Sequence, residues 1–378
     1  MSSKENMRQS NFELMRIVSM FMIIIWHILI HGEVINNTAY TSNIFFRIIT
    51  CFLAVHVNSF ILLSGYFGYN KDLKVTKVIK LNNSMWFYTL LFVIIFRCFN
   101  LYDINNLEIF KAILPIPFND YWFMTDYLIL YLMSPALNTI INNTNQEKLR
   151  KILISSFILL SVLPWLTGMK FFDINYGLNL LHFFLLYLLG GYLRLYPIEK
   201  NIHFKNYSNN KIKLIAFTFY VILCLSGYFI HLFGDILLKT ESTTLMDIGW
   251  NFYVGIQSYA NPLVVLATVS YFIYFSKLNI KSKFINRISA CTLGIYLIHD
   301  NGYVRKFIYK FLGFNKSVYG LKSLGMILGS AIIIFICSLI IELIRQLIFK
   351  FIYDRKISGK FRKKCRNYFE SLGWNINW

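Results

Sequence analysis

The chain has 378 residues, of which 56% are hydrophobic and only 15% are charged, yet 38 Lys and Arg against 18 Asp and Glu give a net charge of +20. Soluble domains carry about 25% charged residues, so this composition excludes a water-soluble fold. It also excludes a soluble nucleic-acid binder, which gathers its basic residues on one folded face, because here they form short clusters between long apolar runs. The composition predicts an all-α, polytopic membrane helix bundle that contacts membrane lipids and no nucleic acid.

Long apolar stretches recur along the whole chain. A helix rises about 1.5 Å per residue, so roughly 20 apolar residues cross about 30 Å of hydrocarbon. The six cysteines include no CxxC pair, which indicates neither a disulfide framework nor a zinc site. About ten transmembrane helices are predicted, at residues 12–31, 44–69, 84–100, 121–141, 151–169, 177–196, 212–234, 251–276, 286–304 and 321–349.

The distribution of basic residues predicts the orientation. Cytoplasmic loops retain an excess of Lys and Arg. With the N-terminus inside, 27 of the 38 basic residues fall on inner loops and tails. Both termini are therefore predicted to be cytoplasmic, with residues 1–349 as a membrane-embedded domain and residues 350–378 as a basic cytoplasmic tail.

One outer segment, residues 303–314, carries more basic residues than this rule allows. Its apolar residues recur with helical spacing and its basic residues take the other face, as in an amphipathic helix at a membrane interface. We expect it to lie flat on the outer leaflet, either near an anionic acceptor such as a lipid diphosphate or simply anchored on phospholipid headgroups. The apolar face holds Val304, Phe307, Ile308, Phe311 and Leu312, and the basic face Arg305, Lys306 and Lys310.

The first span carries a stripe of polar side chains. Eleven residues separate Arg16 from His27, which returns to the same helix face within about 20° and about 16 Å farther along the axis. Glu13 lies three residues before Arg16, and His31 lies four after His27, so all four share one face. Such groups are costly in a membrane and are functional candidates.

This stripe suits acyl transfer from a coenzyme A thioester. An arginine at the inner mouth can bind phosphate with bidentate contacts, and a histidine farther along can accept a proton from an acceptor hydroxyl. Two other interpretations stay open for these residues. Arg16 can be an interfacial arginine that follows the positive-inside rule, and His27 can be a structural histidine bonded to a neighbouring helix.

Arg16, ten residues and then His27 resemble the first helix of the acyltransferase-3 family, integral membrane O-acyltransferases that modify bacterial cell-surface polysaccharides. Three further segments resemble elements of that family and follow in the same order. They are residues 57–67 (VNSFILLSGYF), residues 121–135 (YWFMTDYLILYLMSP), and Ser289 with residues 294–299 (GIYLIH).

The resemblance implies an O-acetyltransferase of the bacterial cell membrane. Acetyl-CoA would be the donor, and a hydroxyl of a surface polysaccharide or lipid-linked glycan the acceptor. By the same resemblance His27 would be catalytic and Arg16 would bind the donor, with Ser64 and Gly65 bordering the cavity. Donor contacts are also expected from Lys74 and Lys77, where the family often has arginines.

Four further residues are candidates for the acceptor side: His31, Trp122, Asp126 and His299. Asp126 can pair with His27 or neutralise Arg47 or Arg97. His27 and His31 have the spacing of zinc ligands, but no third ligand lies nearby in the sequence, so we expect no metal. The alternative function is a glycolipid transporter or flippase, in which the polar stripe lines a substrate path without chemistry.

Overall fold

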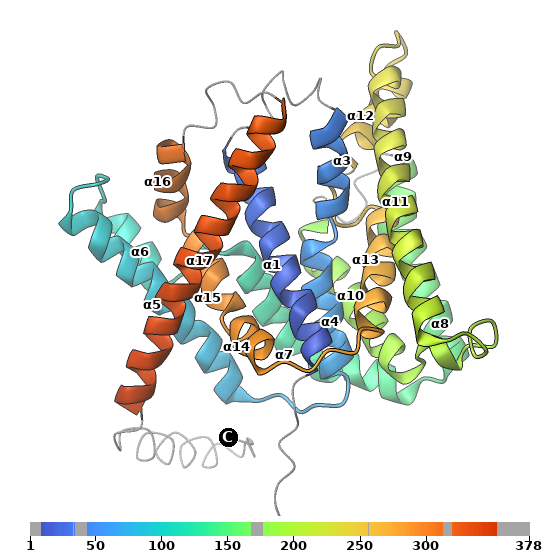
Figure 1. Cartoon of the computed structure of the whole chain (residues 1–378), viewed down its shortest axis with the longest axis horizontal. Coiled ribbons are helices and arrows are strands. Elements are labelled where there is room, and N and C mark those ends of the chain that lie inside the picture. The colour runs from blue at the N-terminus through green and yellow to red at the C-terminus, as the bar shows by residue number, and fades with distance from the viewer. Residues whose placement is uncertain are drawn as a thin grey trace, which may run out of the picture.

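The computed structural model describes residues 9–32, 34, 44–167, 177–255, 257–312 and 320–353, and this part of the chain is helical with no strand. Figure 1 shows the helices packed side by side. A π-helical turn at residues 158–162 joins α8 to α9. In chain order the helices are α1 (Ser10–His31), α3 (Ile44–Leu53), α4 (His56–Gly68), α5 (Val75–Cys98), α6 (Asn106–Ile113), α7 (Trp122–Asn143), α8 (Gln146–Phe157), α9 (Leu163–Thr167), α10 (Leu180–Leu195), α11 (Asn209–Leu237), α12 (Thr243–Gly255), α13 (Pro262–Ser276), α14 (Lys283–Ser289), α15 (Thr292–His299), α16 (Gly302–Leu312) and α17 (Gly320–Tyr353).

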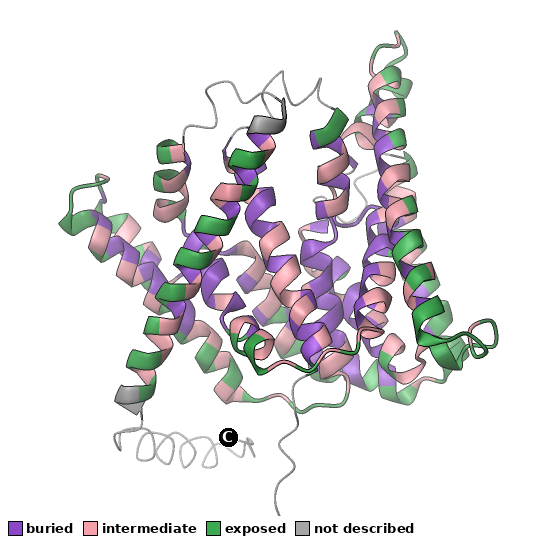
Figure 2. Cartoon of the chain, viewed as in Figure 1, coloured by how far each residue is buried: buried purple, intermediate pink, exposed green. Residues whose placement is uncertain are grey.

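The long helices have the length and apolarity of membrane spans. Large apolar side chains such as Phe229, Ile333 and Leu347 are more than half exposed on outward faces, and Figure 2 shows exposed residues along α11 and α17. Contact with lipid explains this exposure, because lipid hydrocarbon is as apolar as these side chains. Six stretches of the described residues are long and apolar enough to span a membrane: Ser10–His31, Ile44–Gly68, Val75–Cys98, Gln146–Thr167, Asn209–Leu237 and Ser323–Lys350.

Three of the predicted spans are broken in the structure. Residues 44–69 divide into α3 and α4 at a turn of residues 54–55. Residues 251–276 divide into α12 and α13. Asn261 directly precedes Pro262, the first residue of α13, and its side chain accepts a hydrogen bond from the backbone amide of Leu263. Residues 286–304 divide among α14, α15 and α16, where Asn301 accepts from the amides of Tyr303 and Val304. At Asn261 and Asn301 a capping side chain offers the backbone an alternative to a continuous helix. Near the other end, α17 continues to Tyr353 past the predicted boundary at residue 349.

Helix α16 is amphipathic as predicted, but it does not lie flat. In Figure 1 its axis runs along the neighbouring long helices rather than across them. It contacts α1, α5 and α15, and Tyr309 is buried beside His31, with 6.1 Å between ring centroids. Packing against these three helices brings Arg305 of its basic face towards α1 and α15, whereas Lys306 and Lys310 stay exposed.

Close backbone contact joins α4 to α10 next to the polar stripe. A Cβ atom on Gly65 would lie 2.0 Å from the carbonyl oxygen of Tyr187, and one on Gly190 would lie 2.2 Å from that of Leu62. Small residues permit this approach between membrane helices. Gly65 was expected to border the cavity, but in the structure it packs against the backbone of Tyr187 on α10.

Gly190→Ala should therefore destabilise the bundle by about 1–3 kcal/mol, the usual cost of overpacking. Thermal unfolding of the purified protein in detergent should show a lower midpoint. Gly329→Ala is the control, because a Cβ there meets nothing within 4 Å and alanine favours the helix by about 1 kcal/mol over glycine. Equal midpoints for the two variants would contradict the close contact.

Candidate active site

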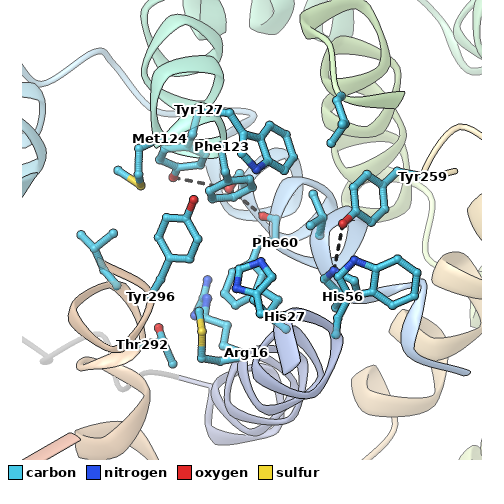
Figure 3. A pocket seen from close by; sticks show the side chains of 18 of the residues that line it. Arg16, His27, His56, Phe60, Phe123, Met124, Tyr127, Tyr259, Thr292 and Tyr296 are labelled. Atoms are coloured by element: carbon cyan, nitrogen blue, oxygen red, sulfur yellow. Dashed lines mark hydrogen bonds between the residues drawn. The ribbon is translucent and has the colours of Figure 1, made fainter. Parts of the chain in front are cut away.

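A cavity of about 580 Å³ lies along the polar stripe of α1. Arg16, His27 and His31 all line it, together with side chains of α4, α7 and α15. Figure 3 shows Arg16 and His27 on one helix with Tyr127, Tyr259 and Tyr296 around the opening. We call the part near Arg16 the Arg16 end and the part near His31 the His31 end. The predicted stripe thus faces one continuous space.

His27 is held by two neighbours on one side of its ring. Its Nδ1 lies 3.1 Å from Nε2 of His299 and 3.5 Å from Oδ1 of Asp300. His299 Nδ1 lies 2.6 Å from the carbonyl oxygen of Ile295, which can only accept, so this nitrogen donates and Nε2 of neutral His299 accepts. His27 Nδ1 therefore carries the proton, and its Nε2 keeps the lone pair that a general base needs.

Asp300 is the carboxylate that pairs with His27. Asp126, proposed above for that role, neither pairs with His27 nor lines the cavity. Asp300 is 4% exposed, and its Oδ1 accepts a hydrogen bond from Nη1 of Arg305 at 3.0 Å. The same Nη1 is 3.4 Å from Nε2 of His31. Arg305 belongs to α16, so the packing of α16 onto α1 completes this group.

His27, His31 and Asp300 together could also hold a metal ion. Their ligand atoms lie within 4.8 Å of one another. Asp300 supplies a third possible ligand although it lies far from both histidines in the sequence, which is why local spacing does not reveal it. The guanidinium of Arg305 contacts both Asp300 and His31, so a metal ion would compete with a positive charge already there.

Arg16 is oriented by its own helix and by α14. Its Nη1 donates to Glu13 Oε1 at 2.7 Å, and Ser289 donates to the other oxygen of Glu13. The guanidinium carbon lies 5.4 Å from the centroid of Phe67. The structure therefore brings Ser289 of the last motif to Glu13 and Arg16 of the first helix, at one end of the cavity.

The Arg16 end also contains residues of the segments 57–67 and 121–135, which resemble family motifs. The hydroxyl of Tyr127 lies 3.4 Å from Ser64 Oγ and 3.5 Å from Lys77 Nζ. Lys77 lies 4.1 Å above the ring of Tyr131, whose hydroxyl accepts from the backbone amide of Lys74. Ser64 and Tyr127 line the cavity itself. The structure thus assembles Ser64, Lys74 and Lys77 beside the two tyrosines.

Positive charge converges on the loop between α4 and α5. Burial, and then the charges of Lys77, Lys74, Arg16 and Arg194, lower the pKa of Lys71. Such mutual repulsion raises the free energy of the cluster, and a bound polyanion would relieve it. The Arg16 end of the cavity is therefore suited to phosphate groups.

A cavity inside a multi-pass helix bundle, lined by His27 with the carboxylate of Asp300 beside that histidine, is the arrangement expected of a membrane-embedded enzyme. The model of an "Acyltransferase domain" matches residues 9–343, and the chain therefore belongs to the acyltransferase-3 family of membrane acyltransferases. No curated protein and no solved structure matches the chain.

Proposed function

We propose that this protein transfers an acetyl group from cytosolic acetyl-CoA to a hydroxyl of a cell-surface glycan or its lipid-linked precursor. The observation that carries the proposal is one cavity that runs from the cations at Arg16 to the base His27. Phosphates of coenzyme A suit the cationic end. The pantetheine arm is long enough to bring the thioester to His27, about 16 Å away along α1.

In the proposed reaction His27 Nε2 removes the proton of the acceptor hydroxyl as its oxygen attacks the thioester carbonyl carbon. The tetrahedral intermediate then collapses, the carbon–sulfur bond breaks, and the proton on Nε2 passes to the departing thiolate. The products are an acetyl ester and coenzyme A. Asp300 stabilises the imidazolium formed between these steps, because it lies 3.5 Å from Nδ1.

The reaction is tested by incubating the protein in inside-out vesicles with acetyl-CoA labelled in the acetyl group. We expect labelled glycan to form on the lumenal side together with free coenzyme A. If labelled acetyl is never transferred but a lipid-linked glycan crosses the bilayer, the protein is a flippase and the proposal is wrong.

The proposal includes ten membrane spans with both termini in the cytoplasm of the bacterial cell. The excess of basic residues on one set of loops supports this orientation. On a background without native cysteines, Lys310→Cys should react with an impermeant maleimide in intact cells, whereas Lys281→Cys should react only after permeabilisation. The reverse pattern would overturn the orientation.

Lys77→Gln should raise the KM for acetyl-CoA about ten-fold, which corresponds to about 1.4 kcal/mol and is near the usual value of a hydrogen bond to a charged group. S-acetyl-pantetheine lacks the nucleotide phosphates, so its KM should not change. Lys151→Gln is the control, because Lys151 is an exposed lysine paired with Glu147 away from the cavity. An equal loss with both donors would show that Lys77 does not contact the phosphates.

A further inference from the structure

Four aromatic rings form a wall of the cavity that the reaction above does not use. Trp122 stacks on Tyr259 with 6.3 Å between ring centroids and 15° between planes. His56 meets Tyr259 edge-on at 5.3 Å, and Trp26 lies 5.5 Å from His56. All four line the cavity. We call Trp26, His56, Trp122 and Tyr259 the aromatic wall.

Buried hydrogen bonds hold this wall rigidly. His56 Nδ1 donates to the carbonyl of Leu53, so its Nε2 accepts from the hydroxyl of Tyr259 at 3.1 Å. The Asn58 amide donates to the carbonyl of Tyr259 at 2.8 Å, and its oxygen accepts from Nε2 of His182 at 3.0 Å. His56, Asn58 and His182 are fully buried. Burying polar side chains is costly unless they are bonded, and each of these three makes at least one hydrogen bond in the network that holds Tyr259.

The wall lies beside His27 but away from the expected donor path. Trp26 precedes His27 on α1, and Figure 3 shows Tyr259 and His56 on the side of the cavity opposite Tyr296 and Thr292. Ser64, where the donor elements gather, is about 12 Å from His56 along α4. A ligand on the wall and a thioester from the Arg16 end can therefore meet at His27 without sharing space.

The chemistry of the wall suits a sugar ring. One face of a pyranose presents C–H groups, which are apolar and weakly positive and pack against the electron-rich faces of aromatic rings. Its hydroxyls need hydrogen-bonding partners. Gln257 and Tyr259 both line the cavity, and the side-chain amide of Gln257 and the remaining lone pair of the Tyr259 hydroxyl can bond them. An acyl chain would need no such polar groups.

We propose that the aromatic wall is the acceptor subsite, where Trp122 and Tyr259 stack on a sugar ring and Gln257 bonds its hydroxyls while one hydroxyl points to His27. This inference rests on the proposed function. It specifies the acceptor as a saccharide bound through its ring face, so the reacting group at His27 is a ring hydroxyl.

The test measures acetyl transfer to surface glycan purified from cells that lack this gene. Trp122→Leu in the full chain should raise the glycan concentration for half-maximal rate at least ten-fold and leave the KM for acetyl-CoA within two-fold. Trp122→Phe should restore part of the loss, because it keeps a ring. Trp86→Leu is the control, since Trp86 is an exposed tryptophan of α5 outside the cavity.

An unchanged glycan dependence in Trp122→Leu would overturn the subsite, and so would a rise in the KM for acetyl-CoA alone, which would assign the wall to the donor. If Trp122→Leu does not fold, Gln257→Ala, which changes a loop side chain, must show the same glycan-specific effect or the inference fails. Wild-type protein that transfers no acetyl to any glycan would instead defeat the proposed function itself.

Discussion

His27→Ala should lower the rate of acetyl transfer by roughly 10²–10⁴, the usual contribution of a general base. The loss should appear in kcat, because alanine removes the proton acceptor and leaves unchanged the donor contacts proposed for Arg16 and Lys77. The measurement is release of coenzyme A by the purified protein with glycan acceptor present.

His203→Ala is the matched control, because His203 is exposed on the loop after α10, outside the cavity. His27→Gln keeps much of the side-chain volume and separates loss of the base from loss of packing; it should be as inactive as the alanine variant. Turnover at the wild-type rate in either His27 variant would show that His27 is not the general base.

Asp300→Asn should lower kcat about 10²-fold and leave the KM values unchanged. An amide cannot neutralise the imidazolium, and it leaves Arg305 without its anionic partner. In a serine-protease triad the same change costs roughly 10⁴, and we expect less here because His299 also contacts His27 Nδ1.

The comparison for this variant is Asp247→Asn, which removes a carboxylate from an exposed position on α12. Asp300→Glu keeps the charge and should recover part of the rate. If Asp300→Asn were fully active while Asp126→Asn lost activity, the carboxylate that serves His27 would have to be reassigned.

Regular spacing explains which parts of the site could be predicted. Arg16, His27 and His31 share one face because helical periodicity alone places them there, and all three line the cavity. The membrane class followed from composition, and the family from four ordered motifs, which the match over residues 9–343 confirms. Glu13 and Ser289 could be named, but their hydrogen bond could not.

Contacts between distant helices explain what the prediction missed. His27 pairs with Asp300 and not with Asp126 because α15, which ends next to Asp300, packs against α1. Arg305 enters the site because one side of α16 packs against α1 and α15. Gly65 serves the α4–α10 contact instead of the cavity. No spacing rule links such residues, since their proximity depends on how side chains fit between helices.

The sequence by itself therefore determined that this chain is a membrane helix bundle and that its first helix carries a cation and a histidine on one face, because composition and period are local properties. Only the tertiary structure decided which groups surround His27 and which aromatic rings line the cavity with it. The physical reason is that partners far apart in the chain are chosen by packing between helices, which a linear pattern does not encode.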